Sequence, residues 1–138
     1  MTTHIDIVPK WVRIVIGLLA LANIAFGISG YFSMDGLFQN SSEGVDLTGL
    51  AARYASYEFA ARNLAIGLAL MIVALKGVPE SLAIMAIVRA LVEVQTILTG
   101  LFTGHLGAGI AVAAVILALE LFVIKTLVGV IAERDRVK

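Results

Sequence analysis

The most apolar stretch of the chain, residues 108–131, reads AGIAVAAVILALELFVIKTLVGVI, and its only charged side chains are those of Glu120 and Lys125. A transmembrane helix needs about 20 consecutive, mostly apolar residues. The stretch is therefore predicted to cross a membrane as a helix. Three earlier stretches have the same character and are predicted to span as well, at residues 11–32, 54–75 and 81–101.

The composition of the whole chain agrees with this interpretation. Of its 138 residues, 60% are hydrophobic and 14% are charged, whereas a soluble domain has about 45–50% apolar and about 25% charged residues. Short turns at residues 76–80 and 103–107 contain glycine or proline and require antiparallel neighbours. The sequence predicts an all-α fold, an integral membrane four-helix up-down bundle that forms a single domain over residues 1–138.

The basic residues predict the orientation of the bundle, because lysine and arginine gather on the cytoplasmic side of membrane proteins. With four spans, the two termini and the second turn lie on one side, which carries Lys10, Arg13, Lys76, Arg134, Arg136 and Lys138. The other side has Arg53 at a helix end and a long loop with Asp35, Glu43 and Asp46. We therefore expect a multi-pass protein with cytoplasmic N- and C-termini.

Several functional classes find no support in the sequence. The chain has no cysteine, and its 10 basic residues equal its 10 acidic ones. Thiolate metal sites and thiol redox chemistry are excluded, and no net charge indicates a nucleic-acid partner. No histidine or acidic cluster predicts a metal site, and no motif predicts a bound nucleotide, so we expect no cofactor.

Five charged residues lie deep within the predicted spans: Glu58, Arg62, Arg89, Glu93 and Glu120. Arg13 and Lys125 also fall within spans, but near their cytoplasmic ends, where their side chains are expected to reach the membrane surface. Each of the five deep charges costs about 2.5–3.5 kcal/mol to insert at a helix centre, and such residues usually face the bundle interior and pair there. Residues four apart share a helix face, as Glu58 and Arg62 do, and as Arg89 and Glu93 do. We expect these faces to point inward.

Depth in the membrane suggests which charges pair. At a rise of about 1.5 Å per residue, Arg62 and Glu93 both lie roughly 12 Å from the non-cytoplasmic side. Arg89 and Glu120 both lie roughly 18–20 Å from that side. The predicted ion pairs are Arg62 with Glu93 and Arg89 with Glu120. Further polar residues near these levels or faces are expected to help bind a ligand, together with Glu58: Asn23, Tyr54, Asn63 and Gln95.

The intramembrane charges are unequal in number, with three carboxyl groups against two guanidinium groups. Arginine stays protonated, whereas a poorly solvated carboxyl group can take up a proton. Because Glu58 is nearest the surface, Glu93 or Glu120 is predicted to be the neutral acid. A purely structural role for the network, in which ion pairs fix which helix packs on which, stays open.

Two motifs carry a resemblance to a known family. The stretch EFAARNLAIGL at residues 58–68 and RALVE at residues 89–93 resemble the small four-helix DoxX-like membrane proteins, in particular relatives of unassigned role. The resemblance covers residues 54–126. It implies that Arg62, Arg89 and Glu93 are the family's motif residues, and that the protein is an accessory subunit of a quinone-linked oxidoreductase or has a different, unassigned role.

Three functional hypotheses follow from the sequence. The first is a pocket in the lipid bilayer that binds a small lipophilic molecule and performs acid–base chemistry on it, such as isomerisation, cyclisation or epoxide opening. In this hypothesis the catalytic residues are Arg62, Arg89, Glu93 and Glu120. The second is a non-catalytic accessory subunit or lipophilic-ligand-binding protein. The third is a proton-coupled transporter, which with four helices would require a dimer, so a homo-oligomer stays open.

Overall fold

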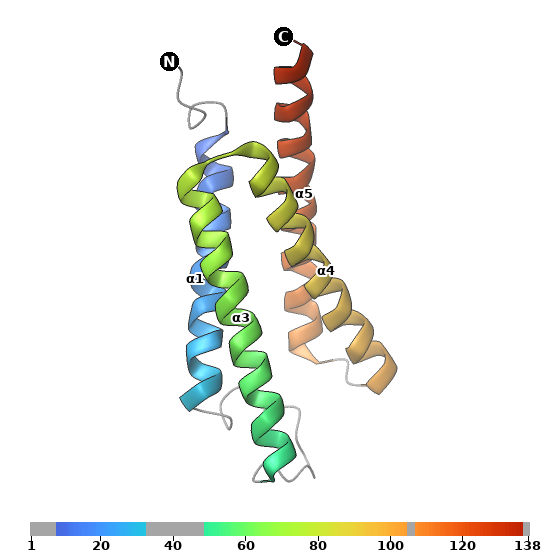
Figure 1. Ribbon diagram of the computed structural model, residues 1–138. Coiled ribbons are helices and arrows are strands. Elements are labelled where there is room, and N and C mark those ends of the chain that lie inside the picture. The colour runs from blue at the N-terminus through green and yellow to red at the C-terminus, as the bar shows by residue number, and fades with distance from the viewer. Residues whose placement is uncertain (1–7, 33–48, 105–106, 137–138) are drawn as a thin grey trace. The chain divides into compact units, whose positions relative to one another are not determined.

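The computed structural model describes residues 8–32, 49–104 and 107–136, and all secondary structure within these ranges is helical (Figure 1). Four long helices follow one another: α1 (Lys10–Phe32), α3 (Leu50–Lys76), α4 (Pro79–Thr103) and α5 (Ala108–Arg136). The predicted all-α fold with four spanning helices is therefore confirmed. Asp35, Glu43, Asp46 and Lys138, which entered the orientation argument, lie outside the described residues.

Each helix is long and apolar enough to cross a membrane. The shortest has 23 residues and the longest 29, which corresponds to about 34–44 Å against a hydrocarbon core of about 30 Å. Many large apolar side chains face outward, including those of Phe32 and Phe102, both 87% exposed. Water solvates such a surface poorly and lipid solvates it well. The protein is a multi-pass membrane protein.

All four helices extend beyond their predicted spans, and α3 and α5 do so by the most residues. α3 begins at Leu50 instead of Tyr54 because nothing between these positions breaks a helix. α5 continues to Arg136 instead of ending near Ile131. Its charged last turn places Arg134 2.5 Å from Glu80 in the first turn of α4. Basic residues suit a helix C-terminus and acidic residues an N-terminus, so both helix ends are stabilised.

The chain divides into two compact units. The unit of residues 17–71 holds α1 and α3 as an antiparallel pair in close contact. A Cβ atom added to Gly67 would lie 2.8 Å from the backbone nitrogen of Ile24, and one added to Gly27 would lie 2.7 Å from that of Leu64. The two backbones approach so closely because these positions are glycine.

Polar and aromatic contacts also join α1 to α3 in this unit. The Ser56 hydroxyl donates a hydrogen bond of 2.8 Å to the carbonyl oxygen of Gly30, and Ser56 is buried. The rings of Tyr31 and Tyr57 stack with their centroids 5.7 Å apart. Within the described part of this unit the helices are joined by close packing and hydrogen bonding, and no ion pair occurs between them.

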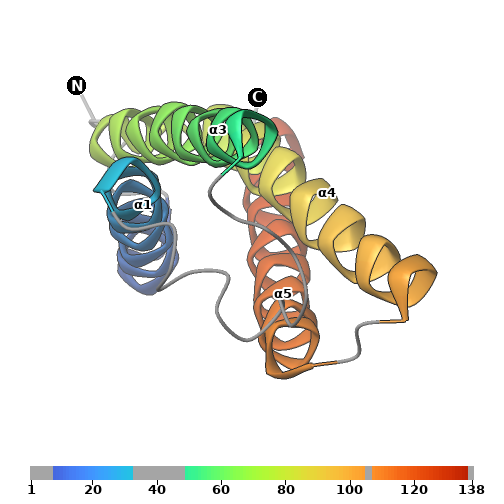
Figure 2. The same ribbon diagram turned by 90° about the horizontal axis from the view of Figure 1, so that it is seen from below.

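The other unit comprises residues 1–16 and 72–138 and is dominated by α4 and α5. These helices run antiparallel and cross, approaching each other toward the start of α4 and the end of α5 (Figures 1 and 2). The glycine that ends α4, Gly104, has a φ of 72° and donates its N–H to carbonyls of the last turn. This left-handed conformation favours glycine and terminates the helix.

The first turns of α1 belong to the same unit and contact the end of α3 and the middle of α5. The Arg13 guanidinium donates hydrogen bonds to the carbonyl oxygens of Ala74 (3.1 Å) and Leu75 (3.3 Å). These carbonyls lie in the last turn of α3, where intrahelical donors are missing. The Trp11 ring stacks on Phe122 of α5, with centroids 5.4 Å apart. Arg13 thus caps α3 instead of only reaching toward the membrane surface.

Candidate functional site

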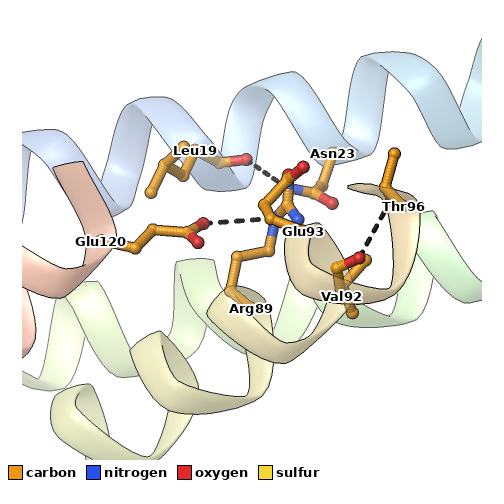
Figure 3. A network of polar contacts seen from close by, with 7 residues as sticks. All are labelled: Leu19, Asn23, Arg89, Val92, Glu93, Thr96 and Glu120. Carbon is orange, nitrogen blue, oxygen red and sulfur yellow. Dashed lines mark hydrogen bonds and ion pairs between the residues drawn. The ribbon is translucent and has the colours of Figure 1, made fainter. Parts of the chain in front are cut away.

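A buried cluster of three ionisable side chains lies between α4 and α5 (Figure 3). Arg89 and Glu93 are one turn apart on α4 and form an ion pair through a guanidinium Nη2 and a carboxylate Oε1. Their side chains are 10% and 7% exposed. Because their spacing places both on one helix face, the backbone of α4 alone is enough to bring the pair together.

Glu120 of α5 is the third member of the cluster, and its side chain is completely enclosed. Its Oε1 atom lies 3.8 Å from Nε of Arg89, which is within ion-pair range but too long for a hydrogen bond. The predicted pairing of Arg89 with Glu120 is therefore present as an ion pair. Among the residues that the structure describes, no hydrogen-bond partner lies near either carboxyl oxygen of Glu120 or the Nε atom of Arg89.

The surroundings explain why Glu120 has no donor. One turn away on α5 lie Ile116 and Val123, which offer only apolar side chains. On the facing side of α4, the buried neighbours of Arg89 are Ala86 and Ala90. Further along α4, the hydroxyl of Thr96 donates to the carbonyl of Val92 in its own helix. Buried polar groups normally have partners, so an unpartnered carboxyl group requires an explanation.

The charges of the cluster do not balance. One guanidinium group faces two carboxyl groups, so the cluster is neutral only when one carboxyl group holds a proton. Arg89 already gives its closest contact to Glu93. Glu120 has an ion pair without a hydrogen bond, and a carboxylate anion is costly to bury in that state. Chemically, a carboxyl group beside a fixed guanidinium charge is able to give up and take back a proton.

The predicted asparagines are occupied within their own helices. Asn23, which is 2% exposed, donates a hydrogen bond of 2.7 Å to the carbonyl of Leu19. Asn63 donates one of 2.8 Å to the carbonyl of Phe59. Both hydrogen bonds join the side-chain amide to the backbone carbonyl four residues earlier in the same helix. They use part of the donor capacity of each asparagine that ligand binding would require.

Four further predicted residues are exposed: Tyr54, Glu58, Arg62 and Gln95. Glu58 and Arg62 lie on the side of α3 opposite to the face that packs on α1 through Ala60 and Gly67. These two side chains therefore do not face α1, and their predicted orientation toward the interior of the whole bundle stays a prediction. Arg62 and Glu93 belong to different units, and their pairing stays a prediction.

The sequence analysis missed two residues that join helices. Ser56 and Arg13 bind carbonyl groups of a neighbouring helix. A serine or arginine in a span is a weak signal, because either side chain can also bond within its own helix or reach the membrane surface. Their partners are backbone atoms, which no sequence pattern marks.

Comparisons of the chain with models of protein families, with curated proteins and with solved structures find no match. The resemblance to the DoxX-like proteins stays a prediction. The functional interpretation must therefore be derived from the Arg89–Glu93–Glu120 cluster itself.

Proposed function

We propose that the Arg89–Glu93–Glu120 cluster is an acid–base site within the membrane that acts on a small lipophilic molecule. The observation that carries this proposal is the enclosed carboxyl group of Glu120, which has no hydrogen-bond partner and lies 3.8 Å from the Arg89 guanidinium. Ionisable residues within membrane spans are rare, and by default they indicate function. Acid–base catalysis needs a group whose proton is exchangeable in its surroundings.

Each member of the cluster has a distinct chemical role in this proposal. Glu120 is the neutral acid and gives its proton to an oxygen or a carbon of the bound molecule. The carboxylate that remains is stabilised by the adjacent Arg89, whose charge does not change. Glu93 holds the Arg89 guanidinium in place through their ion pair. Return of a proton from the product to Glu120 completes the cycle, so no net proton is consumed.

The surroundings restrict the substrate class. Apart from the cluster, the neighbouring buried residues of α4 and α5 are apolar, as Ala86, Ala90 and Val123 are. A substrate with one polar group on a hydrocarbon body fits such a site, and it would enter from the bilayer. Isomerisation, cyclisation and epoxide opening are the reactions that this pair of groups supports without a cofactor.

Infrared spectroscopy of the purified protein tests the assignment of the acid. We expect the carbonyl-stretch band of a protonated carboxylic acid in the wild type, and its loss in Glu120→Gln. Glu133→Gln, which changes an exposed carboxyl group in the last turns of the same helix, is the matched control and should retain the band. A band that persists in Glu120→Gln and disappears in Glu93→Gln would refute the assignment to Glu120.

Lipid extracts test the chemistry. Membranes that contain the wild type should convert a lipophilic precursor into a product of equal mass, or of the mass of precursor plus water. In membranes that contain Glu120→Gln the precursor should accumulate, whereas Glu133→Gln should behave as the wild type does. If extracts of wild-type and Glu120→Gln membranes are identical while both proteins are folded and equally abundant, the cluster is structural.

We also propose that both termini face the cytoplasm. The contacts of Arg13 with the end of α3 and of Arg134 with the start of α4 support a common location for these helix ends, and the basic residues there favour the cytoplasmic side. Because the chain has no cysteine, single-cysteine variants report topology directly. Lys76→Cys should react only with a reagent that enters the cell, and Thr103→Cys with one that stays outside. The reverse pattern would invert the orientation.

A further inference from the structure

In the unit of residues 1–16 and 72–138, several basic side chains near the start of α1 and the end of α5 are left without an acidic partner. Arg13 and Arg134 are engaged there, the first with backbone carbonyls and the second with acidic side chains. Four other basic side chains are exposed, and none of them forms an ion pair with a residue that the structure describes: Lys10, Lys76, Lys125 and Arg136. This part of the surface therefore carries uncompensated positive charge.

Two of these residues, Lys10 and Lys125, flank the stacked rings of Trp11 and Phe122, whose centroids are 5.4 Å apart. Lys10 directly precedes Trp11 on α1, and Lys125 follows Phe122 by three residues, on the same side of α5. The stack therefore brings one lysine from each helix into the same neighbourhood. The rings of Trp11 and Phe122 are 38% and 57% exposed, and a tryptophan in this position is typical of the boundary between membrane and water.

The position of Lys125 along α5 agrees with that boundary. Lys125 follows Ala108, the first residue of α5, by 17 positions, which is about 26 Å of helix against a hydrocarbon core of about 30 Å. When α5 begins at one surface of this core, the long side chain of Lys125 reaches the other surface. The ammonium group of Lys125 therefore lies at the level of the lipid headgroups.

Among the residues that the structure describes, no carboxylate neutralises this pair of lysines. The acidic partners of Arg134 are already engaged. Glu133 lies eight residues beyond Lys125, or about 12 Å further along α5. Glu120 lies about 140° around the helix from Lys125 and is completely enclosed. Basic groups that are gathered without acidic neighbours attract an anion from their surroundings.

We propose that Lys10 and Lys125 bind the phosphate of an anionic phospholipid whose glycerol and upper acyl segments lie against the Trp11 and Phe122 rings. Lysine binds phosphate as a point charge, and basic residues at the membrane surface attract anionic lipids. The exposed parts of the two rings add an apolar contact that a free phosphate ion cannot use, which is the reason for assigning a lipid. One bound lipid links the start of α1 to α5.

Fluorescence quenching tests the site, because Trp11 is the single tryptophan of the chain. The protein is reconstituted into phosphatidylcholine vesicles that contain a small fraction of either phosphatidylglycerol or phosphatidylcholine brominated near the glycerol, since bromine quenches tryptophan at short range. At equal content, brominated phosphatidylglycerol should quench Trp11 more strongly than brominated phosphatidylcholine does. Excess unbrominated phosphatidylglycerol should relieve the additional quenching.

Removal of either lysine should weaken this preference. Lys10→Gln and Lys125→Gln should each lower the relative affinity for phosphatidylglycerol about fivefold, the contribution typical of a lysine near an anionic membrane surface. Lys125→Arg keeps the charge and should retain the preference. Arg136→Gln is the matched control, because it removes an exposed basic side chain from the same helix at about 16 Å from Lys125. Its quenching should equal that of the wild type.

Three results would overturn the proposal. Equal quenching by the two brominated lipids would show that the site does not recognise the headgroup charge. Equal weakening by Arg136→Gln and Lys125→Gln would show that the attraction is spread over the whole basic surface. Relief of the quenching by inorganic phosphate as effective as that by phosphatidylglycerol would show that the site binds a free anion. None of these measurements depends on the acid–base chemistry proposed for the Arg89–Glu93–Glu120 cluster.

Discussion

The α1–α3 pair and the α4–α5 pair are held together by different kinds of contact. Between α1 and α3, glycines bring the backbones together, and the described polar contacts are neutral, as for Ser56 and Gly30. Between α4 and α5, the contact encloses Arg89, Glu93 and Glu120. Lipid removes most of the hydrophobic driving force for helix association, so close packing and polar contacts must provide it. The contact between α1 and α3 therefore involves neutral groups, whereas the contact between α4 and α5 involves ionisable ones.

The largest effect is expected from removing the cation of the α4–α5 pair. Arg89→Met leaves Glu93 and Glu120 buried without a counter-charge, which should lower the free energy of unfolding by about 3–5 kcal/mol. The measurement is an unfolding titration in mixed detergent micelles. Adding Glu93→Leu and Glu120→Leu should recover most of the loss, since apolar replacement of a whole buried ion cluster is often neutral. An unchanged stability of Arg89→Met would show that the cluster is solvated.

The next largest effect is expected in the α1–α3 pair. The Cβ atom of Gly67→Ala would meet the backbone of Ile24 at 2.8 Å, so the helices must separate, at a cost of about 1–3 kcal/mol. Gly17→Ala is the matched control, because nothing lies within 4 Å of its added Cβ. Alanine favours the helix over glycine, so the control should be neutral or stabilised by up to about 1 kcal/mol. Equal responses of the two variants would contradict the close packing at Gly67.

A smaller effect is expected from the hydrogen bond between α1 and α3. Ser56→Ala removes the only side-chain donor to the Gly30 carbonyl described here and should cost about 0.6 kcal/mol, the typical value for such bonds between membrane helices. Ser29→Ala is the control, since its hydroxyl bonds to Phe26 of its own helix. The same unfolding titration should separate the two variants, and a greater loss from Ser29→Ala would reverse the assignment.

The smallest effect is expected at the surface end of the α4–α5 pair. Arg134 pairs with Glu80 and Asp135, whose side chains are 43% and 56% exposed. Exposed ion pairs are weak and are screened by salt. Arg134→Gln should therefore leave the unfolding transition unchanged at moderate ionic strength. A shift in the unfolding transition as large as that of Arg89→Met would contradict the expectation that buried ion pairs contribute more to stability than exposed ones.

The parts of the structure that were predictable from the sequence depend on short-range rules. The four spans follow from apolar length, and the Arg89–Glu93 pair follows from helical spacing. The level of Glu120 was also predictable, because equal depth places it beside Arg89. Each of these inferences uses only positions along a helix and the thickness of the bilayer.

The remaining features depend on rotation about the helix axis, which spacing does not determine. Glu58 and Arg62 share a face, but their spacing cannot show whether that face meets α1 or turns away from it. The glycines at 27 and 67 decide this point, because the close contact of α1 and α3 passes through them. The capping of α3 by Arg13 was not predictable either, since its acceptors are backbone carbonyls.

The ion pair between Arg89 and Glu93 has a consequence for biogenesis. Both partners lie on α4, four residues apart, so this helix carries its own counter-ion when it leaves the ribosome. It can enter the bilayer as a nearly neutral segment before any neighbour is present. α5 is synthesised afterwards, and the Arg89 guanidinium that its buried Glu120 approaches is already in the membrane. The order of the helices along the chain thus places the Arg89 guanidinium in the membrane before Glu120 arrives.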